Sequence, residues 1–132
     1  MRGSPKNMMS KNDYENVTKD VCKYFSERID KAKSFGINDI IIDPGFGFSK
    51  TTQQNYELFN NLEFFKEFQR PIIVGISRKS MIYKILNTTP EKALNGSSVL
   101  HTISLMKGAN ILRTHDVKEA LECVKIVSQL NG

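Results

Sequence analysis

The sequence predicts an α/β fold in which parallel strands alternate with helices. Three short apolar runs begin near residues 39, 71 and 110, and they are rich in isoleucine and valine, as the buried strands of parallel sheets are. Around these runs, apolar residues recur at three- and four-residue spacings, which indicates amphipathic helices. We therefore expect the order α-β-α-β-α-β-α, joined by right-handed crossovers into one parallel sheet.

The first unit is expected to be a helix followed by a strand. The helical pattern starts at Tyr14 and ends at Gly36, which suits the position after a helix end. Its apolar stripe consists of Val17, Val21, Tyr24, Phe25, Ile29 and Ala32. Residues 38–43 read Asn-Asp-Ile-Ile-Ile-Asp, which predicts a strand buried on both faces, and the glycines and proline of residues 44–48 forbid regular structure.

The second unit repeats this plan. A helix with apolar positions from Tyr56 to Phe68 is expected to end before Pro71, where the second strand begins and runs to Ile76. A polar segment over 77–80 and a helical turn over 81–86 follow, and Thr89 with Pro90 indicates another helix start. A helix is then expected over 97–106, ended by Gly108, and a third strand over 109–113. The last helix is expected to start at Asp116 and Glu119 and to run to about residue 130.

Composition narrows the classes of function. The net charge of +5 favours anionic ligands, but the basic residues are dispersed, which argues against a nucleic-acid surface. The apolar runs are far shorter than the ~20 residues of a membrane span, and the first residues lack the apolar core of a secretory signal. We therefore expect a cytoplasmic protein whose two cysteines, Cys22 and Cys123, are reduced and structural.

Polar side chains cluster where each predicted strand ends. Asp43 follows the first strand, residues 77–80 follow the second, and Arg113 and His115 end the third. Because the carboxyl ends of parallel strands form one rim, where ligands bind in such folds, we expect these groups to face a common mouth.

The loop after the first strand allows two interpretations. Asp43, if partly desolvated, could bind the paired N–H donors of an aminopyrimidine, or it could simply cap the turn before Pro44. Gly45 and Gly47 could let the backbone approach a ligand or form a plain tight turn. Phe46 and Phe48 could stack on a flat ring or pack internally.

The other two clusters suit an anion. Residues 77–80 start a helix, where free N–H groups and the charge of Lys79 favour an anion, although a solvated basic turn is the alternative. Arg113 and His115 alternate along the chain and could clamp a phosphate or pyrophosphate, unless Arg113 pairs with Asp116. We assign Asp116 to the helix cap and His101 to a structural role, and the spacing of His, Cys, Asp and Glu indicates no protein-built metal site.

These segments resemble the dihydropteroate synthase family over nearly the whole chain. Residues 1–5 (Met-Arg-Gly-Ser-Pro) resemble its loop after the fifth strand, 43–48 its Asp-Pro-Gly-x-Gly-Phe motif, and 75–80 its Gly-x-Ser-Arg-Lys-Ser motif. Residues 95–97 and 108–117 resemble its last two signatures. Ser49 stands where glycine is usual and Thr114 where valine is usual.

The resemblance implies the last four βα units of a (β/α)8 barrel, with residues 1–132 as the carboxyl-terminal half of that domain. It also implies condensation of p-aminobenzoate with hydroxymethyl-dihydropterin pyrophosphate, with release of pyrophosphate and of the Mg2+ bound to it. Lys79, Arg113 and His115 would be catalytic. Substrate would be bound by Asp43, Phe48, Gly75, Lys79, Ser80, Arg113 and His115. A homodimer through the helices around the last strands is implied too, with neither nucleic acid nor membrane as a partner.

The same resemblance predicts that the sequence is truncated at its amino-terminal side. The family's early mobile loops, an asparagine that helps to hold metal and pyrophosphate, and a second pterin-binding aspartate and asparagine have no counterpart here. We therefore expect the isolated chain to be inactive. A non-catalytic half-barrel that binds pterin or anion, or that only dimerises, is the first alternative. A corrinoid-linked methyltransferase domain is the second, but the Lys79 and Arg113 signatures argue against it because that chemistry expels no pyrophosphate.

Overall fold

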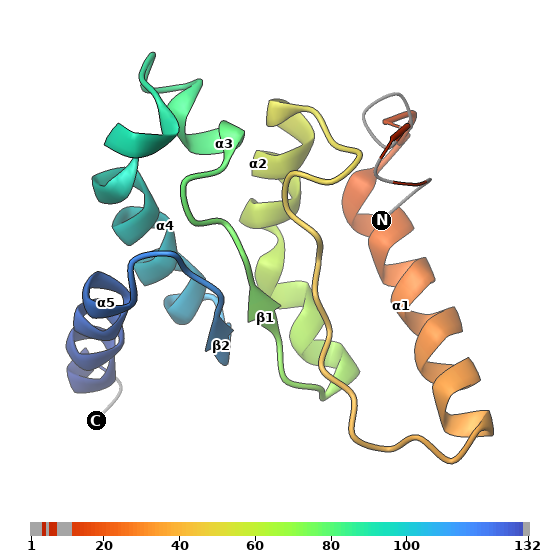
Figure 1. Ribbon diagram of the computed structural model, residues 1–132. Helices are drawn as coiled ribbons and strands as arrows, with labels where there is room; N and C mark the ends of the chain where they lie inside the picture. Colours follow the sequence, from red (N-terminus) through yellow and green to blue (C-terminus); the bar gives the residue numbers. More distant parts are fainter. Residues whose placement is uncertain (1–3, 5, 8–11, 131–132) are drawn as a thin grey trace.

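The structure is a computed structural model that describes residues 4, 6–7 and 12–130, so the first predicted loop, residues 1–5, lies almost entirely outside the described residues. Figure 1 shows the arrangement of the elements. They are α1 (Val17–Ser34), α2 (Thr52–Asn60), the 3-10 helix η2 (Leu62–Phe68), β1 (Ile73–Val74), α3 (Ser80–Tyr83), the 3-10 helix η3 (Pro90–Lys92), α4 (Leu94–Met106), β2 (Ile111–Leu112) and α5 (Val117–Leu130). The predicted parallel strands between helices are confirmed for the second and third predicted strands, which are shorter than expected.

Helix α1 follows the predicted stripe but begins later than Tyr14. The side chain of Asn16 accepts a hydrogen bond from the backbone N–H of Lys19 at 2.8 Å, which caps the helix directly before Val17. Four stripe residues are buried against the rest of the chain: Val17, Val21, Phe25 and Ile29. Tyr24 is exposed, so the buried stripe is narrower than the predicted one.

The helix predicted over residues 56–68 is two elements. Thr51 and Gln54 form a reciprocal capping box that starts α2, a signal that the sequence interpretation missed. The chain then turns at Asn61 and continues as the tighter helix η2, which ends at Gln69 in a left-handed conformation with φ of 51°. Because η2 keeps Leu62 and Phe65 fully buried, the apolar pattern is the same for both geometries.

The strands are parallel and lie side by side in sequence order. In the register of β1 and β2, Ile73 is opposite Ile111 and Val74 is opposite Leu112. The first predicted strand is wrong as a regular element, because only Ile42 pairs, in an isolated parallel bridge to Ile72. Residues 38–41 have no strand partner within the described part of the chain, which leaves them as an irregular edge.

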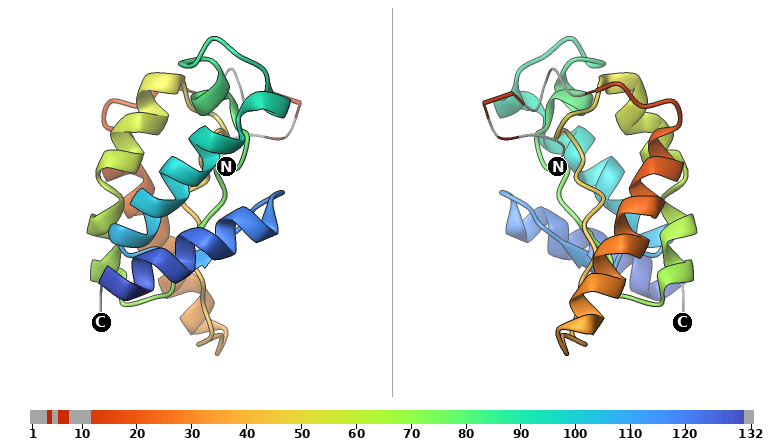
Figure 2. Two further views of the ribbon diagram at one scale, coloured as in Figure 1. Left: turned by 90° about the vertical axis from the view of Figure 1, so that its left-hand side faces the viewer. Right: turned by 90° about the vertical axis from the view of Figure 1, so that its right-hand side faces the viewer.

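Among the described elements, helices cover one face of these strand segments. Figures 1 and 2 show α2 and η2 behind the strands and α4 beside them, with no described helix directly in front of β1 and β2. Accordingly Ile42 is 3% exposed, whereas its neighbour Ile41 is 56% exposed. The prediction that the first strand is buried on both faces is therefore wrong. An apolar run indicates that a segment is stable when buried, but it does not show whether the chain itself covers both faces.

Two further findings concern the helices. In the part of the chain that the structure describes, none of them combines the length and the apolar character needed to cross a lipid bilayer. Cys22 lies in α1 and Cys123 in α5, and both are free thiols, as expected.

Candidate functional site

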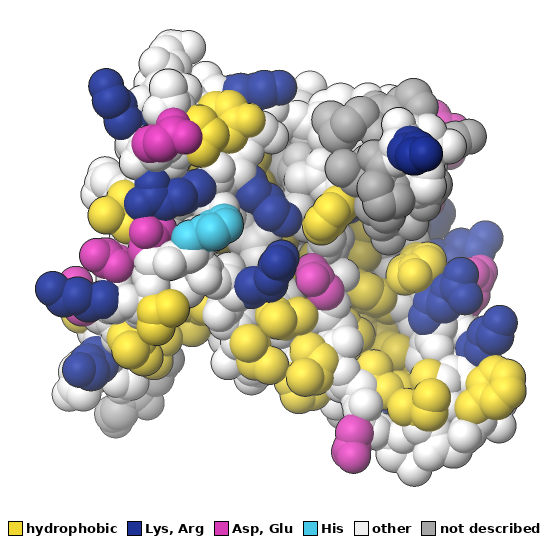
Figure 3. Space-filling model, viewed as in Figure 1, with side chains coloured by type: hydrophobic (Ala, Val, Ile, Leu, Met, Phe, Trp, Pro, Cys, Tyr) yellow, Lys and Arg dark blue, Asp and Glu magenta, His cyan; other side chains and the backbone are white. Residues whose placement is uncertain are grey.

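The ends of β1 and β2 open into one small pocket. Its lining comes from the segment after β1 and from the segment between β2 and α5, namely Gly75, Ser77, Lys79, Arg113, Thr114 and His115. Figure 3 shows lysine and arginine side chains and a histidine gathered above a band of hydrophobic side chains on the open face. The pocket has a volume of about 130 Å3, which lies below the roughly 300–1,000 Å3 of typical small-molecule pockets. It therefore suits an anionic group rather than a whole ligand.

Lys79 lies at the centre of the rim. Its ammonium donates a hydrogen bond to the carbonyl oxygen of Phe46 and sits 4.7 Å from the centre of the Phe48 ring. Burial lowers the pKa of Lys79, and the nearby Arg113 cation lowers it further, whereas Asp43 acts in the opposite direction. Lys79 is therefore within electrostatic reach of both other predicted clusters.

The helix predicted after residues 77–80 is present but short. Lys79 occupies the position before α3, and Ser80 is the first residue of this four-residue element. Such a short helix has a small dipole, so the charge of Lys79 adds more positive potential to the pocket than the helix end does. Ser80 is half-buried beside Lys79 and does not line the pocket.

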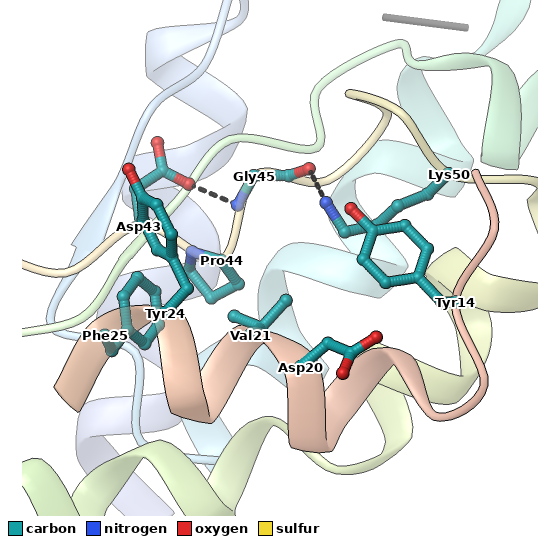
Figure 4. A pocket seen from close by; sticks show the side chains of 9 residues that line it. All are labelled: Tyr14, Asp20, Val21, Tyr24, Phe25, Asp43, Pro44, Gly45 and Lys50. Carbon is teal, nitrogen blue, oxygen red and sulfur yellow. Dashed lines mark hydrogen bonds between the residues drawn. The ribbon is translucent and has the colours of Figure 1, made fainter. Parts of the chain in front are cut away.

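The loop after the first strand is held by its own polar groups. Asp43 is exposed, and its Oδ1 accepts a hydrogen bond from the N–H of Gly45 at 2.8 Å. Figure 4 shows this contact beside the bond from Lys50 Nζ to the Gly45 carbonyl. The expectation that Asp43 is partly desolvated is therefore wrong in this chain, because no strand on the open side covers it within the described residues.

Lys50 and Asn55 were missed by the sequence interpretation. Lys50 is buried, and its ammonium donates to the carbonyl oxygens of Gly45 at 2.8 Å and Phe48 at 3.0 Å. Asn55 accepts from the N–H of Gly47 at 2.7 Å. Both side chains fix a loop that has no regular backbone hydrogen bonding, and nothing in the local sequence marks either of them for this role.

The two aromatic residues of this loop have different surroundings. Phe46 is fully buried and packs edge-on against Phe59, with ring centres 5.6 Å apart. Phe48 is half-buried beneath Lys79. Gly47 has a φ of 88°, and a Cβ there would lie 3.3 Å from the Lys79 side chain, so this glycine permits the close contact of the two loops.

His115 is oriented by Ser77, which the sequence placed in the polar cluster of residues 77–80 without a role of its own. The buried Ser77 hydroxyl lies 3.0 Å from His115 Nδ1 and accepts the backbone N–H of His115 at 3.2 Å. With Nδ1 engaged, Nε2 is the ring nitrogen that remains for a ligand. Arg113 and His115 are both exposed at the mouth of the pocket, as their alternation along the chain leads one to expect.

The expected role of Asp116 is corrected. We assigned Asp116 to the cap of the last helix, with a salt bridge to Arg113 as the alternative. Asp116 does stand directly before α5, and its backbone carbonyl accepts the N–H of Ala120 at 3.1 Å, but its side chain has a different partner from the predicted Arg113. Instead, both carboxylate oxygens of Asp116 accept hydrogen bonds from Arg78, each at 2.8 Å. Arg78 lowers the pKa of Asp116 chiefly through this hydrogen bonding.

His101 is buried in α4, at 1% exposure, as its structural assignment predicted. Among the described residues its Nε2 has no hydrogen-bond partner, and burial lowers its pKa. The unfolded chain therefore takes up a proton first as pH falls through about 6.5, so the free energy of unfolding should fall below that pH.

We expect His101→Gln to flatten this pH dependence. Urea unfolding at about pH 7.5 and about pH 5.5 should show the wild-type chain losing stability and the variant losing less. His115→Gln removes the other histidine, which is exposed, and is the matched control for the loss of an imidazole. An equal loss in the wild type and in the His101 variant would show that another group is responsible.

The chain belongs to the pterin binding enzyme family, whose model matches residues 1–115. Among curated relatives, dihydropteroate synthase of Escherichia coli strain K12 is 43% identical over 129 residues, which is 96% of this chain and 46% of the relative. That of Haemophilus influenzae is 39% identical over 128 residues, again 96% of this chain and 46% of the relative. The chain thus spans about half the length of the curated relatives that it matches.

Solved structures agree with this assignment. The Yersinia pestis dihydropteroate synthase with a sulfonamide drug is similar with a TM-score of 0.95 and 38% identity, covering 99% of this chain and 48% of that one. The Thermus thermophilus enzyme in complex with 6HMPPP is similar with a TM-score of 0.93 and 32% identity, covering 98% of this chain and 52% of that one. The resemblance to dihydropteroate synthase is therefore confirmed, both in sequence and in structure.

Proposed function

We propose that this chain forms the carboxyl-terminal half of the catalytic barrel of a dihydropteroate synthase. The observation that carries the proposal is the meeting of the two family loops at Lys79, which contacts Phe46 and Phe48 while it lines the pocket with Arg113 and His115. The open apolar face, which includes Ile41 and Ile111, supports a barrel interior, because such interiors are filled by branched side chains from other strands.

In this proposal the small pocket binds the pyrophosphate of hydroxymethyl-dihydropterin pyrophosphate. As the bond from pterin to oxygen breaks, negative charge grows on the leaving pyrophosphate, and the positive side chains of Lys79 and Arg113 stabilise it. His115 adds a hydrogen bond through Nε2. The contribution is electrostatic and preorganised, because both loops are fixed before the substrate arrives.

The remaining residues bind the organic parts of the substrates. Asp43 would accept the amino-pyrimidine edge of the pterin, with its exposed carboxylate covered in the complete barrel. Phe48 and Gly75 would line the pterin side, and Ser80 would lie near the carboxylate of p-aminobenzoate. The Thermus thermophilus enzyme has been solved with 4-aminobenzoate as well as with 6HMPPP, which supports these two substrate classes.

The described residues do not fit a protein-built Mg2+ site. Within residues 4, 6–7 and 12–130, no group of three or more His, Cys, Asp and Glu side chains converges. Mg2+ would therefore enter with the pyrophosphate and with a residue outside this chain, and the residues described here act on the pyrophosphate oxygens directly. A homodimer and a cytoplasmic location stay predictions.

A non-catalytic role is the second candidate, and one observation favours it. Helices α4 and α5 present exposed apolar side chains to solvent, including Val99, Met106 and Ile126. This surface supports self-association of the chain without any turnover. Its pocket would then bind an anion with no reaction to follow.

A chimera tests the proposed function. The amino-terminal half of the Escherichia coli relative, joined to this chain in place of its own second half, should condense the two substrates and release pyrophosphate. The isolated chain should release none. Failure of a well-folded chimera to turn over, with the parent enzyme active in the same assay, would favour the non-catalytic role.

A further inference from the structure

Arg78 lies on the rim of the anion pocket, yet its side chain points away from it. The guanidinium binds Asp116 with two hydrogen bonds of 2.8 Å, and its Nη1 also donates to the carbonyl oxygens of Pro90 and Glu91. Its backbone N–H donates to Ser97 Oγ at 2.9 Å. Arg78 is therefore held by three other parts of the chain.

The contact between Arg78 and Asp116 is next to the pocket in the sequence as well as in space. Arg78 directly precedes Lys79, and Asp116 directly follows His115. Both neighbours line the pocket, whereas Arg78 and Asp116 do not. The contact between Arg78 and Asp116 therefore ties together the two backbone segments that carry Lys79 and His115.

The backbone of Arg78 supports the same interpretation. Its φ is 54°, in the left-handed region that residues with side chains rarely occupy. Such a conformation persists only where surrounding contacts impose it, and here the guanidinium contacts do so. The turn that aims Lys79 into the pocket therefore depends on the contacts of Arg78.

We propose that Arg78 and Asp116 are a positioning pair, which sets the spacing of Lys79 and His115 for the pyrophosphate without touching it. The inference rests on the proposed function for the identity of the anion. Because the two charges neutralise each other, the pair adds geometry rather than positive potential to the pocket.

The direction in which Asp116→Asn changes the affinity for pyrophosphate distinguishes a positioning role from an effect of charge. Asp116→Asn and Glu119→Gln each remove one negative charge from the start of α5, and Glu119 acts on Arg78 only through its charge. If charge alone matters, both variants should bind pyrophosphate more tightly. If the pair positions the loops, Asp116→Asn should bind at least about 10-fold more weakly, the scale of a lost orienting partner, while Glu119→Gln should not weaken binding.

Isothermal titration of the 132-residue chain with pyrophosphate measures this, with circular dichroism as the check of folding. Arg78→Lys keeps the charge but loses the two-pronged contact, so it should also weaken binding and serves where Asp116→Asn does not fold. If Asp116→Asn and Arg78→Lys both bind pyrophosphate as tightly as the unmodified chain or more tightly, the inference is overturned.

A ligand-free measurement keeps the inference separate from the proposed function. In NMR spectra, Asp116→Asn should shift the signals of Lys79 and His115 together and speed amide exchange in both loops, whereas Glu119→Gln should leave both loops unchanged. If the wild-type chain binds no pyrophosphate but these shifts occur, the positioning pair stands, and the chimera alone then decides the proposed function. If neither loop responds, the positioning pair itself is wrong.

Discussion

Replacing Lys79 by alanine in the active chimera is expected to lower its turnover at least about 100-fold, the scale of losing one preorganised electrostatic contact to the transition state. The ammonium is partly desolvated, it is fixed by Phe46 and Phe48, and it faces the pocket that Arg113 shares. A charge held in this way need not reorganise as the leaving group forms. The fall should therefore appear in kcat rather than in KM alone.

Lys84→Ala is the matched control. Lys84 is exposed at the other end of α3, so its loss removes the same charge from the same short helix without touching the pocket. The rate of this variant should stay close to that of the unmodified chimera. A Lys79→Ala rate within a few-fold of the control would remove Lys79 from the catalytic group.

The convergence of the site could be predicted because it follows from topology. Lys79 and Arg113 follow strands that are neighbours in sequence, and right-handed crossovers bring the ends of such strands to one edge. The register of β1 and β2 then places the two segments side by side. Predicting this convergence requires only the positions of the strand ends, and the isoleucine-rich runs indicate those positions.

The supporting contacts could not be predicted, because they join residues that nothing local connects. Arg78 and Asp116 are 38 positions apart, and the same separation divides Ser77 from His115. Each of these side chains had a plausible local role, such as a basic turn or a helix cap, and composition does not decide between a local partner and a distant one. Only the fold brings the distant partner within hydrogen-bonding distance.

The error over the first strand has a different origin. Residues 40–42 are three isoleucines, and such a run predicts burial on both faces. In the structure Ile42 meets the core while Ile41 faces the open side. Hydrophobicity indicates the environment in which a segment is stable. The side chains that would cover the open side of Ile41 are not among the described residues.

The largest effect on stability is expected at Phe65, whose replacement by alanine should lower the free energy of unfolding by about 3–5 kcal/mol. Phe65 is 0% exposed, and its ring meets that of Phe25 edge-on with centres 5.4 Å apart. Phe68 stacks beside it at 6.5 Å. This cluster joins η2 to α1, and the small core of a chain with one open face has few other groups to fill the cavity.

Phe64→Ala tests whether the effect comes from burial or from the loss of any aromatic ring in η2. Phe64 is the preceding residue and is 56% exposed, so its loss should change stability by less than about 0.5 kcal/mol. Urea unfolding of both variants measures the difference. Similar losses would mean that η2 does not pack as the structure shows. A large loss at Phe65 alone would support the packing of η2 against α1 through this cluster, and α1 in turn forms one wall of the hollow beside Asp43.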